Sequence, residues 1–209
     1  MRLYSYYRSS ASYRVRIALN IKQVEHSIEP VNLLKKDHKS ADYLIKQPQG
    51  LVPCLETNDG RFLAQSGAIL GYLDSLYPDS TLLVTEPFQA AKIQSFVDMI
   101  ACDIHPICNL RILSYLTNTL KVHSDQKLAW YQHWIVIGFE ALESMLEKTT
   151  YCFGEQVTLA DIYLIPQVYN ALRFEVDMAA FPQIMNVYQN CNQLDAFIQA
   201  MPENQLDAI

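Results

Sequence analysis

Three consecutive polar residues, Arg8, Ser9 and Ser10, stand where a predicted strand gives way to a predicted helix, in YSYYRSSASYRVRIAL (residues 4–19). The N-terminus of a helix presents backbone N–H groups without intrahelical partners and the positive end of the helix dipole, so it can hold an anion. The hydroxyl groups could instead do ordinary capping, with Ser10 or Ser12 as the N-cap. The residues alone leave both interpretations open: a helix cap, or a site for an anionic ligand.

A second group of polar side chains is predicted to share one face of one helix. Its members are Asp98, Cys102, His105 and Asn109. Beside them runs an apolar stripe made by Phe96, Ile100, Ile104 and Ile107. A polar face without Lys or Glu next to a core-facing stripe indicates the wall of a cleft. One alternative is a zinc site at Cys102 and His105, but no second ligand pair at metal spacing accompanies them. A second alternative is that His105 is simply a buried, hydrogen-bonded core residue. We expect Pro106 to kink the helix.

Composition narrows the class of protein that can carry these residues. The chain has 209 residues, of which 50% are hydrophobic and 18% charged, as in a globular protein with a real core. A net charge of −6 argues against nucleic acid or an anionic membrane as partner. No apolar run approaches the length of a membrane span, and because the stretch MRLYSYYRSS has no apolar signal core we do not expect secretion. Five scattered cysteines, an odd number, fit reduced thiols in a cytoplasmic protein.

The first part of the chain alternates short strands with helices. We predict strands at residues 2–7 and 26–33, helices at 12–22, 39–46 and 66–76, and a hairpin whose strands, 52–57 and 61–64, flank the turn Asn-Asp-Gly. Ser66 is expected to be the N-cap of the last of these helices, which Pro78 stops. This β-α-β-α-β-β-α order predicts a small mixed sheet with helices on its faces.

Everything after a turn-rich linker at residues 77–88 is predicted to be helical. One amphipathic helix is expected over residues 126–147, and Thr158 and Asp161 have the spacing of a capping box at the start of another. The predicted organisation is therefore an α/β domain at residues 1–79 and an all-α domain at residues 87–209.

Five motifs, in this order, resemble segments of the zeta class of cytosolic glutathione transferases: RSSASYRVRIAL, PQGLVP, QSGAIL, CDIHPICNLRIL and GEQVTLADIYLIPQV. The resemblance runs from about residue 2 to residue 198. It implies a thioredoxin-like N-terminal domain, glutathione as cofactor, a homodimer, and glutathione-dependent cis–trans isomerisation of maleylacetoacetate. Maleylpyruvate as substrate, or general conjugation of electrophiles to glutathione, are the alternatives. A non-catalytic binding protein is a further alternative, which retention of these motifs disfavours.

The resemblance also assigns roles to individual residues. Ser9 or Ser10 would activate the glutathione thiolate, Ser9 being preferred, because hydrogen-bond donors and positive potential lower a thiol pKa. A cis Pro53 would let the Val52 backbone pair with the cysteinyl part of the peptide, and Gln65 and Ser66 would hold its γ-glutamyl end. The full set of residues assigned to glutathione is Ser9, Ser10, Ala11, His38, Val52, Pro53, Gln65, Ser66, His105 and Asn109.

Three of the seven arginines match positions that would bind a dicarboxylate substrate: Arg8, Arg111 and Arg173. Guanidinium groups grip carboxylates in bidentate fashion, although a lone surface arginine is the commoner finding. No metal site is expected, and no Gly-rich loop is present to hold a phosphate.

The chain departs from the family signature at Ala11, where zeta-class members usually have cysteine. Alanine offers no thiol, proton or hydrogen bond. We therefore expect the serine hydroxyls and the helix N-terminus, and not a protein thiol, to carry the chemistry.

Overall fold

The computed structural model describes residues 1–208, which divide into two compact units. The first comprises residues 1–81 together with residues 192–208, and the second residues 82–191. This division differs from the expected one, because the C-terminal segment groups with the α/β unit and not with the helices that precede it. Two contacts explain the grouping: Arg16 Nε donates to the Ala200 carbonyl at 2.9 Å, and Asn20 Nδ2 donates to the Ala196 carbonyl at 3.0 Å.

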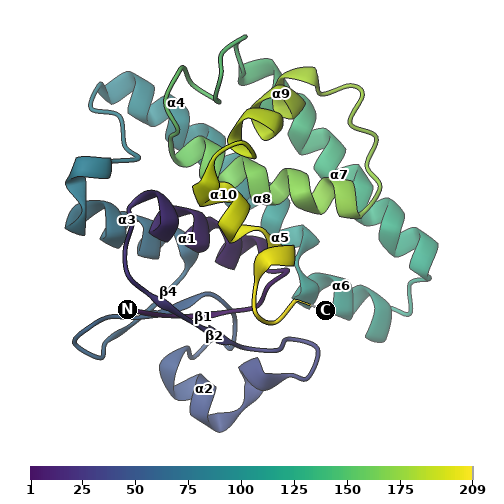
Figure 1. Cartoon of the computed structure of the whole chain (residues 1–209). Helices are drawn as coiled ribbons and strands as arrows, with labels where there is room; N and C mark the ends of the chain where they lie inside the picture. Colours follow the sequence, from purple (N-terminus) through teal and green to yellow (C-terminus); the bar gives the residue numbers. More distant parts are fainter. Residues whose placement is uncertain (209) are drawn as a thin grey trace. The chain divides into compact units, whose positions relative to one another are not determined.

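The first unit has the predicted β-α-β-α-β-β-α order. Its elements are β1 (Arg2–Ser5), α1 (Ser10–Ile21), β2 (Ser27–Pro30), η1 (Asp37–Lys39), α2 (Ala41–Lys46), β3 (Cys54–Glu56), β4 (Phe62–Ala64), α3 (Ser66–Leu76), η2 (Pro78–Ser80), α10 (Asp195–Ala200) and η4 (Pro202–Asn204). The sheet order is β2-β1-β3-β4, with β1 parallel to β2 and antiparallel to β3. Helices α1 and α3 cover one face of the sheet and α2 lies on the other (Figure 1). The thioredoxin-like prediction is confirmed.

The second unit is helical. Its elements are α4 (Pro87–Asp98), η3 (Met99–Ile104), α5 (His105–Cys108), α6 (Leu110–Asn118), α7 (Ser124–Met145), α8 (Leu159–Arg173) and α9 (Pro182–Cys191). Phe96, Ile100 and Ile104 of the predicted stripe are buried in its core. The capping box at Thr158 and Asp161 is present, with the Asp161 carboxylate accepting from the Thr158 N–H at 2.8 Å. None of the helices within residues 1–208 is long and apolar enough to cross a membrane.

The predicted single helix through Asp98 and Asn109 is wrong. The segment Met99–Ile104 is a π-helix, and α5 ends before Asn109, whose backbone is extended. A π-turn inserts an extra residue, so side chains four and seven apart no longer share one face. The physical reason lies in Pro106, which has no N–H to donate and whose ring clashes with the preceding turn.

A buried ion pair fastens α1 to the end of α3. The Nζ of Lys22 is 2.8 Å from Asp74 Oδ1 and also donates to the carbonyls of Tyr77 and Ser80, and neither charged side chain is more than 6% exposed. Thr81 Oγ1 donates to the second carboxylate oxygen at 2.9 Å. The pair thus holds α1, α3 and the start of the linker together.

Replacing Lys22 by methionine is expected to lower the free energy of unfolding by about 3–5 kcal/mol, because it leaves the Asp74 carboxylate buried without its cation. The matched control is Arg61→Met, since the Arg61–Asp59 pair is similarly close but exposed; its loss should be under about 1 kcal/mol. Urea denaturation measures both. Equal effects of the two substitutions would contradict a structural role for the buried pair. The double variant Lys22→Met/Asp74→Leu should be more stable than Lys22→Met, because it leaves no unpaired buried charge.

Candidate functional site

The strand-to-helix junction is closed by Ser9, not by Ser10 or Ser12. Ser9 is the N-cap of α1, with φ −73° and ψ 113°, and its Oγ accepts from the Ser12 N–H at 3.2 Å. A hydroxyl that accepts in this way still has its own proton to donate. Ser9 is half-buried whereas Ser10 is only 7% exposed. Capping and anion binding are therefore compatible in one residue, and accessibility favours Ser9 over Ser10.

The turn that precedes Ser9 is held from both sides. Tyr7 donates its N–H to Asp207 Oδ2 at 3.1 Å and accepts from Arg16 Nη2 at 3.0 Å through its carbonyl. Both Tyr6 and Tyr7 are buried, and burial raises the pKa of Tyr6. Both rings are thus largely withdrawn from solvent. Arg8 is exposed, with its guanidinium carbon 4.9 Å from the centre of the Tyr7 ring.

The Val52–Pro53 peptide bond is cis, as expected. Val52 comes just before β3, and its side chain packs against the buried cluster of Tyr4, Val31, Tyr43 and Cys54. The hydroxyl of Tyr43 donates to the Leu51 carbonyl at 2.7 Å, which fixes the loop on the other side of Val52. The Val52 backbone is thus anchored beside the sheet but lies outside its ladder.

Ser66 is the first residue of α3, and the prediction that it is the N-cap is wrong. Gln65 is the N-cap, with φ +69°, a left-handed value that is unfavourable for a residue with a side chain. Its side chain does not cap the helix but donates to Gln49 Oε1 at 2.7 Å. The Gln65 side chain therefore does not cap the first N–H groups of α3, and Ser66, 6% exposed, lies among them.

The loop at residues 48–53 contains Val52 and Pro53 and contacts two other residues predicted to bind glutathione, His38 and Gln65. Lys39 Nζ donates to the Gly50 carbonyl at 3.1 Å, and a Cβ on Gly50, whose φ is +58°, would lie 2.6 Å from the His38 carbonyl oxygen. Burial, and next the charge of Lys39, lower the pKa of His38, which favours the neutral ring. His38 Nδ1 is buried without a hydrogen-bond partner among residues 1–208. Through Gln49, whose Oε1 accepts from Gln65 Nε2, the same loop contacts Gln65, so His38, Val52, Pro53 and Gln65 lie in or beside this loop.

In the second unit, Asn109 has a capping role that the sequence analysis missed. It is the N-cap of α6, and its Oδ1 accepts from the N–H groups of Arg111 at 3.0 Å and Ile112 at 3.3 Å. Arg111 is exposed in the first turn of that helix, and His105 is half-buried at the start of α5. A Cβ on Gly138 would lie 2.3 Å from Ile104 Cδ1, so only glycine lets α7 approach the π-helix that precedes His105.

Helix α7 also ties the segment that carries Arg111 to the one that carries Arg173. Trp130 Nε1 donates to the Ile107 carbonyl at 3.1 Å. The ring of Tyr131 stacks on Phe174 with centroids 3.8 Å apart. The exposed guanidinium of Arg173 in turn lies 4.6 Å above Phe174. Helix α7 thus contacts α5, which precedes the helix of Arg111, and Phe174, which follows Arg173.

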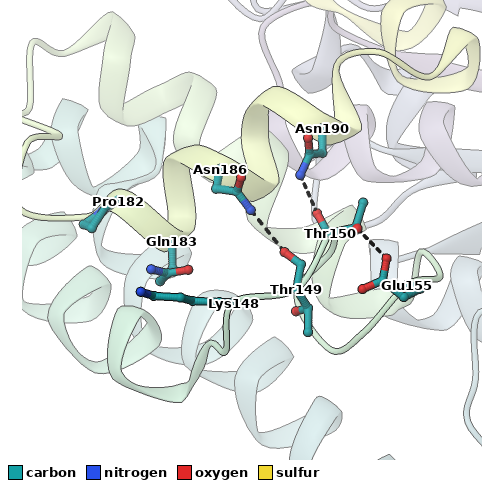
Figure 2. Close-up of a pocket in the computed structure, with 8 residues that line it drawn as sticks. All are labelled: Lys148, Thr149, Thr150, Glu155, Pro182, Gln183, Asn186 and Asn190. Atoms are coloured by element: carbon teal, nitrogen blue, oxygen red, sulfur yellow. Dashed lines mark hydrogen bonds between the residues drawn. The ribbon is translucent and has the colours of Figure 1, made fainter.

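The second unit contains a pocket of about 420 Å³ that includes none of the predicted site residues (Figure 2). Asn186 Nδ2 donates to the Thr149 carbonyl at 3.1 Å and Asn190 Nδ2 to the Thr150 carbonyl at 2.8 Å (Figure 2). Glu143 occupies the N-terminus of α9 by accepting from the N–H groups of Gln183 and Ile184. These bonds hold the loop that carries Thr149 and Thr150 against α9. We therefore attribute the pocket to the packing of this loop and not to a ligand site.

Two residues near the site were not predicted, Gln49 and Arg14. Nη1 of Arg14, a buried residue of α1, donates to Ser66 Oγ at 3.3 Å. The sequence carried a signal for Arg14, since an arginine among the apolar residues of a helix that packs on a sheet is expected to be buried and bonded. Gln49 had no such signal. Within residues 1–208, no group of three or more His, Cys, Asp or Glu side chains is arranged to hold a metal ion.

Comparison with known proteins gives consistent matches over the whole chain. The family models "Glutathione S-transferase, N-terminal domain" and "Glutathione S-transferase, C-terminal domain" match residues 3–81 and 138–195. A probable maleylacetoacetate isomerase of Vibrio cholerae is 45% identical over 99% of this chain and 97% of its own. The holo structure of maleyl pyruvate isomerase, a bacterial zeta-class glutathione S-transferase, has a TM-score of 0.97 at 40% identity, covering 100% of both chains.

One further solved structure carries ligands. Maleylacetoacetate isomerase from Anaeromyxobacter dehalogenans, with dicarboxyethyl glutathione and citrate bound in its active site, has a TM-score of 0.89 at 34% identity. The match covers 100% of this chain and 97% of that one.

Proposed function

Because this chain belongs to the glutathione S-transferase family, in its zeta class, we propose that it is a glutathione-dependent cis–trans isomerase of maleylacetoacetate. The observation that carries the proposal is the likeness over the full chain to isomerases of maleyl keto acids, including a structure that holds dicarboxyethyl glutathione. That ligand is a glutathione whose sulfur bears a dicarboxylate, the product expected when a thiol adds to a C=C bond between two carboxyl groups. Comparing kcat/KM for maleylacetoacetate and maleylpyruvate tests the substrate assignment.

The first unit fits glutathione at each end of the peptide. The N-terminus of α3, with Gln65 and Ser66, would receive the γ-glutamyl carboxylate, because its first N–H groups are not capped by the Gln65 side chain. The Val52 backbone would pair with the cysteinyl residue. His38 Nδ1, buried without a partner among the described residues, would face the glycyl end. Ala11, in the first turn of α1, would contact the ligand through its methyl group alone.

When bound, glutathione supplies a thiolate that adds reversibly to the cis C=C bond, which can then rotate before elimination gives the trans isomer. The protein must keep the thiol deprotonated. Ser9 would do so by donating its hydroxyl proton to the sulfur while its oxygen accepts from Ser12, and the positive end of α1 adds to the effect.

Three arginines would serve the dicarboxylate substrate. Arg8, Arg111 and Arg173 would neutralise the two carboxylates and the enolate charge that develops on addition. Arg173 is favoured for this task because its guanidinium rests on the stacked pair of Phe174 and Tyr131. His105 and Asn109, on the segment before Arg111, would contribute to glutathione binding.

Arg111→Ala and Arg173→Ala are each expected to raise the KM for the dianionic substrate tenfold or more while leaving the Kd for glutathione nearly unchanged. A lost charge-assisted contact is worth roughly 1.5–3 kcal/mol. Steady-state kinetics and calorimetry measure the two quantities. Arg61→Ala, which removes an exposed arginine of the other unit, is the control and should change neither. A parallel loss of glutathione affinity would contradict the assignment to substrate.

A specific observation favours one second candidate, isomerisation of maleylpyruvate, because the structure with a TM-score of 0.97 is named for that activity. The two substrates share the maleyl group and the keto group and differ beyond it, so the same thiolate and arginine chemistry serves both. A rate with maleylpyruvate that exceeds the rate with maleylacetoacetate would transfer the assignment to this candidate.

We propose further that the protein is a cytoplasmic homodimer. Its five cysteines are all free thiols, as expected in a reducing compartment. Exposed apolar side chains such as Phe88, 77% exposed on α4, are what an interface between two copies would cover. Light scattering of the purified protein measures the assembly, and a mass of one chain would refute the dimer.

A further inference from the structure

Helix α1 carries a buried positive charge close to the N-terminus of α3. Arg14 is 2% exposed, and arginine stays protonated in proteins, so a full charge has been withdrawn from water. Burying such a charge is costly unless hydrogen bonds or an opposite charge compensate for the lost hydration. Its Nη1 donates to Ser66 Oγ at 3.3 Å, across the packed surfaces of α1 and α3.

The contact sets the direction of the Ser66 hydroxyl. Because the oxygen accepts from Arg14, its own proton must point elsewhere, and Ser66 is the first residue of α3. At that position the positive end of the α3 dipole and the Arg14 charge act on the same place. An anion at the start of α3 would gain from both, and from a hydroxyl whose proton is free to be donated to it.

We propose that Arg14 is a positioning residue for the γ-glutamyl carboxylate of glutathione, acting through the Ser66 hydroxyl and through its buried charge. The inference rests on the proposed function, since it takes glutathione as the ligand. Arg16 provides a contrast two residues along the same helix. It is equally buried, but its donors go to Ser5 Oγ and to the carbonyls of Tyr7 and Ala200, so it fastens the fold and does not reach Ser66.

The test measures Kd by calorimetry for two ligands, glutathione and 4-aminobutyryl-cysteinyl-glycine, which lacks only the γ-glutamyl α-carboxylate. Arg14→Gln is expected to weaken glutathione binding by about ten- to a hundredfold, the range for a lost charge-assisted contact. It should change binding of the truncated ligand less than about twofold. In the Ser66→Ala background the same substitution should cost less than it does alone, because the two residues act on one group.

Arg14→Lys keeps the charge but not the planar guanidinium, so it should weaken glutathione binding by an intermediate factor and leave binding of the truncated ligand unchanged. If Arg14→Gln does not fold, Arg14→Lys provides the test. Arg16→Lys is the matched control and should affect both ligands equally. Equal weakening of both ligands by the Arg14 variants would overturn the inference, as would a natural protein that binds the two ligands alike. Failure of the natural protein to bind glutathione at all would instead refute the proposed function.

Discussion

Replacing Ser9 by alanine is expected to lower kcat/KM for isomerisation on the order of a hundredfold or more, since removing a single preorganised donor at a developing anion has effects of that size. The Ser9 hydroxyl accepts from the Ser12 N–H and would give its proton to the glutathione sulfur. The pKa of the bound thiol should therefore rise in the variant. Thiolate absorbance of the glutathione complex as a function of pH measures that shift, alongside steady-state rates.

A second substitution separates loss of the donor from loss of the helix cap. Aspartate caps helices as well as serine does but has no proton to donate at pH 7, so Ser9→Asp should stay folded and remain as impaired as Ser9→Ala. Recovery of activity in Ser9→Asp would mean that the cap matters and the donor does not. If Ser10→Ala lost activity while Ser9→Ala remained active, the hydrogen bond to the glutathione sulfur would be assigned to Ser10.

Ala11→Cys restores the cysteine that zeta-class members usually have at this position, and it can be assayed by the same steady-state rates as the Ser9 variants. Ala11 lies in the first turn of α1 and is 9% exposed. Because glutathione already supplies the thiolate, restoring a cysteine should change turnover only modestly. A natural protein without activity that Ala11→Cys revives would contradict the serine-centred account.

Omitting glutathione is expected to have the largest effect of all, reducing isomerisation to the uncatalysed rate. The predicted nucleophile belongs to the ligand, and the protein's buried thiols are poor substitutes. Burial raises the pKa of Cys54 to about 11 and that of Cys108 to about 12. S-methylglutathione is the matched control, because it keeps both carboxylates and the peptide but has no free thiol. It should inhibit in competition with glutathione and should not support turnover.

Equal rates with and without glutathione would show that a group of the protein is the nucleophile. Turnover with S-methylglutathione would show that the ligand acts only by ordering the site. Either result would contradict the role assigned to the thiolate.

The elements of the first unit could be predicted because their signals are local. The Asn-Asp-Gly turn fixed the β3–β4 hairpin, Pro78 marked the end of α3, and alternation of strands and helices indicated the sheet. The grouping of residues 192–208 with this unit could not be foreseen. An amphipathic helix shows that it has an apolar face but not which surface covers it, and that choice depends on Arg16 and Asn20 meeting α10.

The sequence identified candidate site residues, but it did not predict the local backbone geometry that positions them. Candidate positions near both helix starts were identified, but both caps were assigned too late. At α1, nearby serines are equally good caps by sequence, and at α3 the cap is Gln65, a residue type that rarely caps. Helical periodicity failed between Asp98 and Asn109, since a fixed period cannot anticipate the π-turn before Pro106. Arg14 was overlooked because its partner Ser66 is distant in sequence and the contact exists only in the fold.

Proton NMR of one reaction mixture, containing the protein, one equivalent of glutathione and an excess of cis maleylacetoacetate, distinguishes isomerisation from conjugation. The vinyl coupling constant reports the geometry of the double bond, and the cysteinyl β-proton shifts report whether the sulfur is substituted. The account predicts that the trans keto acid accumulates over many turnovers while glutathione is recovered as the free thiol. Consumption of glutathione in proportion to substrate, with a stable sulfur conjugate as product, would identify a conjugating transferase and contradict it.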